Sequence, residues 1–435
     1  DAITTADENT LVGYVAGSSL TTGEDNVLIG SLTGDALTEG KDNVAVGRNS
    51  LSADTKGRQS VAIGSSALSA QNFTTLTDTF NTAVGASAGT AVTTGTDNTL
   101  IGGSAGDAIT TSNANTALGR LALSAETTSN GNTAIGAEAL KNQNVGGSGD
   151  ARNTAVGLLA GANVSTGIDN TLIGALAGDA LTDADYNVAI GKSSLSTDTL
   201  GSRNVAVGYG SLTNQNFTSA TNSYNVAMGF NAGEQITTGI QNTTIGGLAG
   251  DALTDADANT ALGYEALSTD TRGSHSTAIG RRALKAQNYT SATDSHNTAV
   301  GNNAGLAVTT GIQNTLIGSE AGSRNICIGI EAAQNTNNLT TGVDNIAIGY
   351  QARVNAGDAA NQMVMGKQVT CQGNNEFTFG NGATDSNIAF GATSISAPSD
   401  ERYKEEITTS TAGLSFIKDL RPVTFKWKKA KDVPV

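Results

Sequence analysis

One pentapeptide dominates this sequence: Asn, a β-branched residue, a small residue, a large aliphatic residue and Gly, repeated about twenty times between Gly13 and Gly349. The Gly-to-Gly spacing follows the order 17, 17, 17 and 21, and this quartet occurs four times, up to Gly301. A 17-residue unit is therefore the basic repeat, and four units form a 72-residue super-repeat. Such a strict period predicts a repeat architecture in which each unit buries its apolar face against its neighbours.

The pentapeptide itself predicts a short strand, because β-branched residues that end in Gly favour a strand over a helix. About two such strands and two turns fit into one unit, so we expect each unit to form one coil of a β-solenoid, with strands stacked about 4.8 Å apart. Asn81 and Asn98 are expected at coil corners, where Asn tolerates αL geometry and its amide bonds to the Asn of the next coil. Gly85 and Gly102 are expected to make turns that a Cβ would block.

The composition supports thin layers rather than a thick globular core. Aromatic residues make up only 4% of the chain, whereas there are 54 Gly. The net charge of −15 and the lack of a Lys/Arg stripe argue against nucleic-acid binding, and no apolar stretch is long enough to insert into a membrane as a helix. Cys327 and Cys371 lack the spacing of metal ligands, and Cys327 is interpreted as a small core residue.

The other residues capable of metal chemistry lie in turns. The Asp-Ala-Asp turns offer too few ligands for a calcium-binding loop, so we expect them to be solvated. The two histidines are interpreted as surface residues without a partner. We therefore expect no metal site and no cofactor. The residues concerned are Asp183, Asp185, Asp255, Asp257, His275 and His296.

The apolar pattern of the strand predicts an oligomer. Neighbouring side chains of a strand point to opposite faces, yet the third and fourth positions of the pentapeptide, such as Ala83 and Val84, are both apolar. One face is expected to fill the coil, and the other to pack against another chain.

The pattern "NTAVG…NTLIG…NTALG…NTAIG" resembles the head repeats of trimeric autotransporter adhesins over about residues 1–350. This resemblance implies an all-β chain that forms a left-handed parallel β-roll, a β-solenoid assembled as an intertwined or side-by-side homotrimer. The period differs, because those heads commonly use shorter coils.

The C-terminal segment resembles a different family. The motif Ser399-Asp400-Glu401-Arg402-Tyr403-Lys404 is followed by an apolar stretch around residues 414–420 and by Pro422-Val423-Thr424-Phe425, as in the endosialidase-type intramolecular chaperone of phage tail fibres and tailspikes. The resemblance implies trimerisation and then self-cleavage between Ser399 and Asp400, with Ser399 as nucleophile and Lys404 as its base. Without the flanking match, Ser399 would be a helix N-cap at a charged helix start.

Three segments follow from these patterns. Residues 1–318 are the regular β-roll shaft, residues 319–398 an irregular β-roll and transition region, and residues 399–435 the truncated N-terminal part of the chaperone domain. Because residues 1–13 match residues 107–119 in phase, the chain starts inside a repeat. We expect it to be a piece of a longer protein.

Together these features predict the structural shaft of a phage tail fibre, a virion protein that attaches to a host-cell receptor of glycan or protein nature. The alternative is a trimeric adhesin on a bacterial surface. A tailspike enzyme that cuts host glycans would need paired carboxylates in a groove, whereas the acids here recur in turns. Apart from self-cleavage, we therefore expect no enzymatic activity.

Host recognition is expected where the regularity breaks, since loops that leave a solenoid often carry its binding function. The last coil of each super-repeat has four extra residues. Phe73, Phe217 and Tyr289 occupy one equivalent position in these coils, with Val145 in the remaining one. Two interpretations stay open: a ladder of ligand-contacting aromatics, or rings that pack under the enlarged loop.

Overall fold

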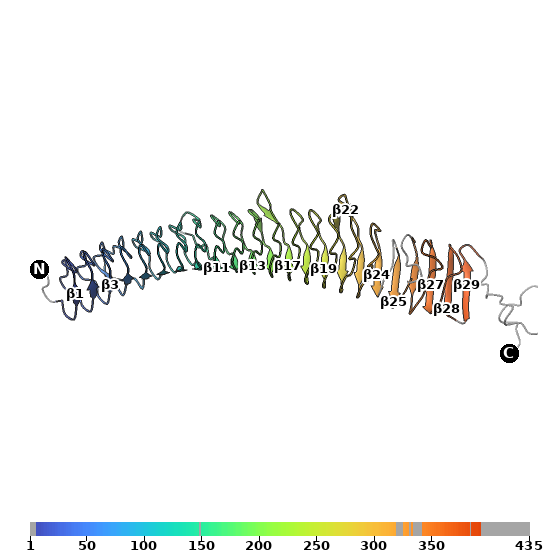
Figure 1. Ribbon diagram of the computed structural model, residues 1–435, viewed down its shortest axis with the longest axis horizontal. Helices are drawn as coiled ribbons and strands as arrows, with labels where there is room; N and C mark the ends of the chain where they lie inside the picture. Colours follow the sequence, from blue (N-terminus) through green and yellow to red (C-terminus); the bar gives the residue numbers. More distant parts are fainter. Residues whose placement is uncertain are drawn as a thin grey trace, which may run out of the picture.

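The computed structural model describes residues 6–147, 149–318, 325–329, 332–333, 342–382 and 384–392. In these residues every regular element is a β-strand, and the coils follow one another in sequence order along one elongated rod (Figure 1). A search of the same residues for an apolar helix long enough to cross a membrane finds none. The predicted all-β solenoid with 17-residue coils is confirmed.

The main sheet runs the length of the rod and takes one strand from each coil. Within the described ranges it has 23 strands. They are β1 (Thr10–Val12), β2 (Val27–Ile29), β3 (Val44–Val46), β5 (Val61–Ile63), β7 (Thr82–Val84), β8 (Thr99–Ile101), β9 (Thr116–Leu118), β10 (Thr133–Ile135), β11 (Thr154–Val156), β12 (Thr171–Ile173), β13 (Val188–Ile190), β15 (Val205–Val207), β17 (Val226–Met228), β18 (Thr243–Ile245), β19 (Thr260–Leu262), β21 (Thr277–Ile279), β23 (Thr298–Val300), β24 (Thr315–Gly318), β25 (Ile326–Gly329), β26 (Ile346–Ile348), β27 (Gln362–Lys367), β28 (Glu376–Asn381) and β29 (Thr384–Ala389).

Pairing in the main sheet is parallel and in register, so that equivalent residues of successive coils lie side by side. Ala83 of β7 lies opposite Leu100 of β8, and Leu100 lies opposite Ala117 of β9. Beyond β24 the coil length varies: β24 pairs with β25 at an offset of 11 residues and β25 with β26 at an offset of 20. The antiparallel pair β28–β29 ends the described part of the sheet.

Within the described residues, a second strand occurs only at three of the four enlarged coils and in the coil before each of these, which corrects the expectation of about two strands in each coil. Most of each coil outside the main sheet is turn, because residues with positive φ, such as Ser87 at 59° and Asp97 at 61°, interrupt any extended run. The backbone of these turns still forms hydrogen bonds between successive coils, as from Thr93 N–H to Thr110 C=O at 2.9 Å. The short pairs are β4 (Gly57–Arg58) with β6 (Thr77–Asp78), β14 (Gly201–Ser202) with β16 (Thr221–Asn222), and β20 (Gly273–Ser274) with β22 (Thr293–Asp294).

The Asn column forms a buried ladder of amides, as the sequence predicts. Oδ1 of Asn81 accepts hydrogen bonds from the backbone N–H and from Nδ2 of Asn98, at 3.0 and 3.3 Å. The same Nδ2 donates to Ser112 C=O at 2.9 Å, and Asn115 repeats the pattern on Asn98. The αL geometry expected at Asn lies one residue earlier, for example at Asp97, because that residue makes the turn and the Asn side chain points into the coil.

The Gly column is required by the close approach of successive coils. Gly85 and Gly102 have φ values of 142° and 136°. A Cβ on Gly85 would lie 2.4 Å from the carbonyl oxygen of Gly102. Any side chain in this column would therefore separate the coils.

A narrow aliphatic core fills the coils. The third position of each pentapeptide, which is the middle residue of a three-residue strand, points inward, and Ala83 and Leu100 are fully buried. A second inward position, four residues after the column of Gly85, alternates between Gly89 (φ 57°) and residues such as Leu68 (φ 49°). A Cβ on Gly89 would lie 2.7 Å from Leu100 Cδ1. In a coil with Gly at this position, other side chains such as Leu100 therefore fill the interior, whereas in the coil of Leu68 the residue's own side chain fills it. For Leu68, burial worth about 2 kcal/mol offsets an αL cost of about 1 kcal/mol.

In three of the four super-repeats, one acid has a carboxylate oxygen buried in an unfavourable environment. Asp35, Asp179 and Asp251 each bury a carboxylate oxygen that has no hydrogen-bond partner. Burial, with a smaller contribution from the nearby carboxylates of Glu234 and Glu265, raises the pKa of Asp251 to about 6. A raised native pKa means that the folded chain binds more protons than the unfolded chain between about pH 4 and pH 6, so stability falls as the pH rises through this window.

We therefore predict that Asp251→Asn stabilises the protein at pH 7.5 but not at pH 4. Asp251 is half-buried, so solvent screening reduces the gain to about 1 kcal/mol. Thermal unfolding at both pH values measures the difference. Asp257→Asn is the control, because its carboxylate accepts the Ile240 N–H at 2.8 Å and its replacement relieves no unpaired oxygen. An equal gain in stability at both pH values would contradict the raised pKa of Asp251 as its cause.

Candidate functional site

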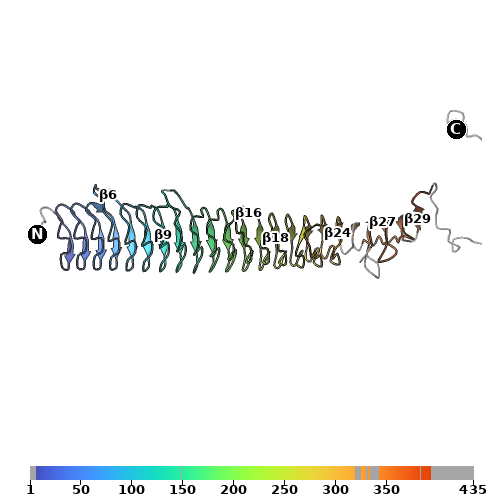
Figure 2. The same cartoon turned by 90° about the horizontal axis from the view of Figure 1, so that it is seen from above.

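The enlarged coils form the only regular interruption of the described shaft up to residue 318, and they are built on a buried acid. Figure 2 shows β6 and β16, which belong to two of these coils, along one edge of the rod. An acid in the preceding coil and a Gln in the enlarged coil are both fully buried in every super-repeat. These pairs are Asp54 with Gln71, Glu126 with Gln143, Asp198 with Gln215, and Asp270 with Gln287.

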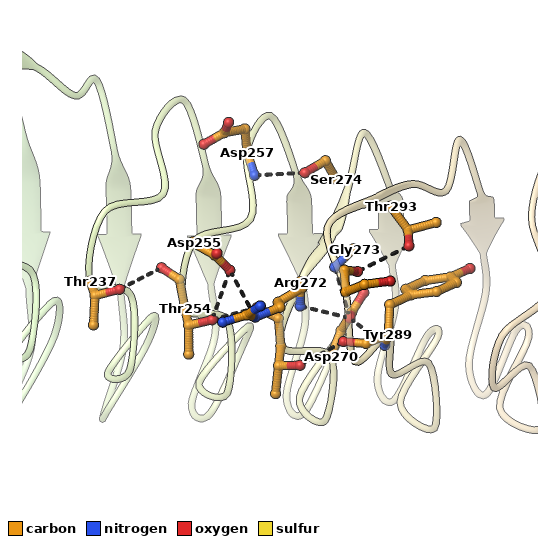
Figure 3. A network of polar contacts seen from close by, with 12 residues as sticks. Thr237, Thr254, Asp255, Asp257, Asp270, Arg272, Gly273, Ser274, Tyr289 and Thr293 are labelled. Atoms are coloured by element: carbon orange, nitrogen blue, oxygen red, sulfur yellow. Dashed lines mark hydrogen bonds and ion pairs between the residues drawn. The ribbon is translucent and has the colours of Figure 1, made fainter.

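The fourth of these acids shows how the enlarged coil is held (Figure 3). Oδ1 of Asp270 accepts the backbone N–H groups of Gly273 and Tyr289 at 3.0 and 3.3 Å, and Oδ2 accepts Gln287 Nε2 at 2.6 Å. Gln287 Oε1 in turn accepts Nδ2 of Asn297 at 2.8 Å, which joins the insertion to the Asn ladder. In the first super-repeat, burial raises the pKa of Asp54, while hydrogen bonds from Gln71 and the backbone act in the opposite direction.

The three aromatic rings predicted for this region lie inside the coil. Phe73, Phe217 and Tyr289 are only 7%, 6% and 5% exposed. The hydroxyl of Tyr289 donates to Gly311 C=O at 2.6 Å, and burial raises its pKa to about 12. So little ring surface is left for a ligand that packing under the enlarged loop accounts for all three residues.

Exposed aromatics occur elsewhere on the enlarged coils, at a position the sequence analysis missed. Phe80 and Tyr224 are 56% and 51% exposed, and each directly precedes the Asn of the ladder. Tyr186 precedes the ladder Asn of an ordinary coil, and Arg203 lies over its ring with 4.8 Å between Cζ and the centroid. Phe80 and Tyr224 are 144 residues apart, which is the length of two super-repeats, and this spacing is the sequence signal that they occupy equivalent positions.

An apolar surface, which we call the outer strand face, runs along the main sheet. It consists of the outward-pointing residues of the strands and of the residue that follows each pentapeptide Gly, which is Arg or Lys in four coils and uncharged in the others. Tyr209 and Phe230, one coil apart, stack with 5.5 Å between ring centroids. Large members of this face that are at least 37% exposed are Val12, Tyr14, Ile29, Ile63, Leu118, Leu158, Ile173, Tyr209, Met228, Phe230, Leu262, Tyr264, Ile317, Ile326, Ile328, Tyr350 and Met365.

The remaining sequence candidates fall into three groups. The Asp-Ala-Asp acids serve the turns: Asp185 Oδ1 accepts the Ile168 N–H at 2.8 Å, and Asp255 pairs with Arg272 at 3.4 Å. Cys327 is a buried free thiol, as expected, and burial raises its pKa to about 12. The expectation that the histidines have no partner is wrong, because His275 lies 3.1 Å from Asp294 and stacks on a second histidine.

Ser399, Asp400 and Lys404 lie outside the described residues. The comparison with protein families bears directly on this segment. Residues 399–434 match the family model described as the chaperone of endosialidase, whose members are autoproteolytic intramolecular chaperones. No curated protein matches the sequence. The chain is thus a β-solenoid rod followed by a segment similar to the endosialidase chaperone, a combination that supports a tail-fibre-like protein.

Proposed function

We propose that this chain is the shaft of a homotrimeric phage tail fibre that serves host attachment, and that its C-terminal segment belongs to a self-cleaving trimerisation chaperone. The observation that carries the proposal is the match of residues 399–434 to the endosialidase chaperone, immediately after a long solenoid. A rod of stacked coils is suited to hold a binding surface away from a particle, because each coil is supported by its two neighbours.

The outer strand face is the proposed contact between the three chains. Apolar surfaces of this extent are rare on monomers and mark interaction sites. The chain has 39 acidic residues, yet in the twenty repeats none occupies the second or fourth pentapeptide position or the position after the Gly. An acidic chain that keeps one face free of carboxylates is suited to meet a second copy of itself there, since equivalent acids would otherwise face one another.

We predict that Met228→Asp combined with Phe230→Asp dissociates the trimer. Each substitution would bury an unpaired carboxylate between the chains, and a trimer contains six of them. At about 1.5 kcal/mol each, the combined cost of about 9 kcal/mol raises the overall dissociation constant by roughly six orders of magnitude. Sedimentation equilibrium measures the mass: three chains for the wild type and one for the variant at low micromolar concentration.

Thr238→Asp is the matched control for this experiment. Thr238 is exposed in a turn outside the outer strand face, and other coils carry Glu39, Asp183 or Asp255 at the same position. This control should remain trimeric. A wild-type protein that sediments as a monomer, or a double variant that stays trimeric, would contradict the proposed interface.

A further prediction concerns self-cleavage of the full-length protein. Ser399→Ala and Lys404→Ala should each abolish cleavage beside Ser399, because one removes the nucleophile and the other its base. Denaturing gels and intact-mass measurement would show the uncleaved chain. Ser396→Ala and Lys418→Ala, which remove a neighbouring hydroxyl and a neighbouring amine, should cleave as the wild type does. Unchanged cleavage in both test variants would refute the Ser–Lys assignment.

A further inference from the structure

The chain has two histidines, and the structure brings them together on its surface. His275 and His296 are separated in the sequence by the length of one enlarged coil, so they occupy the same corner in successive coils. Their rings stack with 5.1 Å between centroids. Nδ1 of His275 lies 3.1 Å from Oδ1 of Asp294. One ligand atom from each of these three exposed residues lies within 4.8 Å of the others.

We propose that His275, Asp294 and His296 bind a divalent transition-metal ion such as Zn²⁺. Two imidazole nitrogens and one carboxylate oxygen are donors that suit zinc, nickel and copper better than calcium or magnesium. Donor atoms around one such ion lie roughly 3–3.5 Å apart, so small rotations of exposed side chains complete the site. Its remaining coordination positions face solvent and are open to water or to a donor group of a bound partner.

The backbone that carries the three ligands is already ordered. His275 follows β20 and Asp294 ends β22, and Ser274 pairs with Asp294 across these two strands. The backbone N–H of His275 donates to Asp257 C=O at 3.0 Å. His275 and His296 have φ values of 62° and 51°, the geometry of their whole column. Binding therefore needs side-chain adjustment rather than folding of a loop.

The equivalent positions in the other super-repeats show what distinguishes this one. In each of them an arginine contacts the side chain at the position equivalent to Asp294. Arg58 pairs with Asp78 at 2.7 Å, and Arg152 pairs with Asp150 at 3.4 Å. Arg203 Nε donates a hydrogen bond to Asn222 at 3.0 Å. Each arginine sits where the fourth super-repeat has Ser274, His296 or His275, respectively. In the fourth super-repeat the acid faces imidazoles, which leaves room for a cation from solution.

The test is a calorimetric titration of the protein with ZnCl₂, using protein made without a polyhistidine tag. We expect one Zn²⁺ per chain. His275→Gln and His296→Tyr should each weaken binding at least about tenfold, the smaller end of the loss seen when even an outer-shell partner of a metal is removed. Both replacements occur naturally in this fold, because Gln59 and Tyr224 occupy the same positions in other super-repeats. Unchanged thermal unfolding in metal-free buffer confirms that each variant folds.

Asp78→Asn is the matched control, since it removes the equivalent acid of the first super-repeat and should leave zinc binding unchanged. The wild-type protein should also bind Zn²⁺ with unchanged affinity when the titration is repeated in excess Ca²⁺. The proposal is overturned if the wild type shows no saturable Zn²⁺ binding, if both histidine variants bind as tightly as the wild type, or if Ca²⁺ displaces the zinc.

Discussion

The whole rod depends on coils that stack in register, and the buried amide of the Asn column enforces that register. An Asn Oδ1 accepts the backbone N–H of the equivalent residue in the next coil, and in many coils also the Nδ2 of that residue, as Asn98 shows for Asn81. A slip of one residue would bury these amides without partners, a cost of about 1–3 kcal/mol for each group. The Gly column adds a steric condition, because only a residue without Cβ fits beneath the next coil at Gly85. Together these two columns maintain the 17-residue period over most of the shaft.

The enlarged coils show how this order accepts an insertion. Four extra residues enlarge the coil, and a buried pair of an acid and a Gln holds the enlarged segment in each super-repeat. Asp270 holds two backbone N–H groups and Gln287, and Gln287 reconnects to the ladder at Asn297. Where Ser60 interrupts the Asn column, Gln71 donates to its hydroxyl at 2.8 Å. The insertion therefore leaves the register of the main sheet unchanged, and the next super-repeat starts in phase with the previous one.

Most of the shaft could be predicted from the sequence because each column repeats often enough to show its environment. That Ala83 and Val84 point to opposite faces followed from their neighbouring places in a strand, whereas the inward direction of Ala83 is known only from the structure. Phe73, Phe217 and Tyr289 could not be placed in this way, since they lie in the insertion, where no period separates inside from outside. The second strand expected in each coil failed because turn geometry, not residue type, decides that part of the chain. The expectation that His275 and His296 have no partner fails because both directly precede a pentapeptide, and residues at that place meet in successive coils.

The central claim is that each 17-residue unit adds one coil to a continuous solenoid. Deleting residues 86–157 removes one 72-residue super-repeat and joins Gly85 to Leu158, which is the junction that normally follows Gly157. The account predicts a folded rod of unchanged width that electron microscopy finds shorter by about 19 Å, four coils of about 4.8 Å each. An unchanged length, or a shortening that departs clearly from four coil spacings, would contradict it.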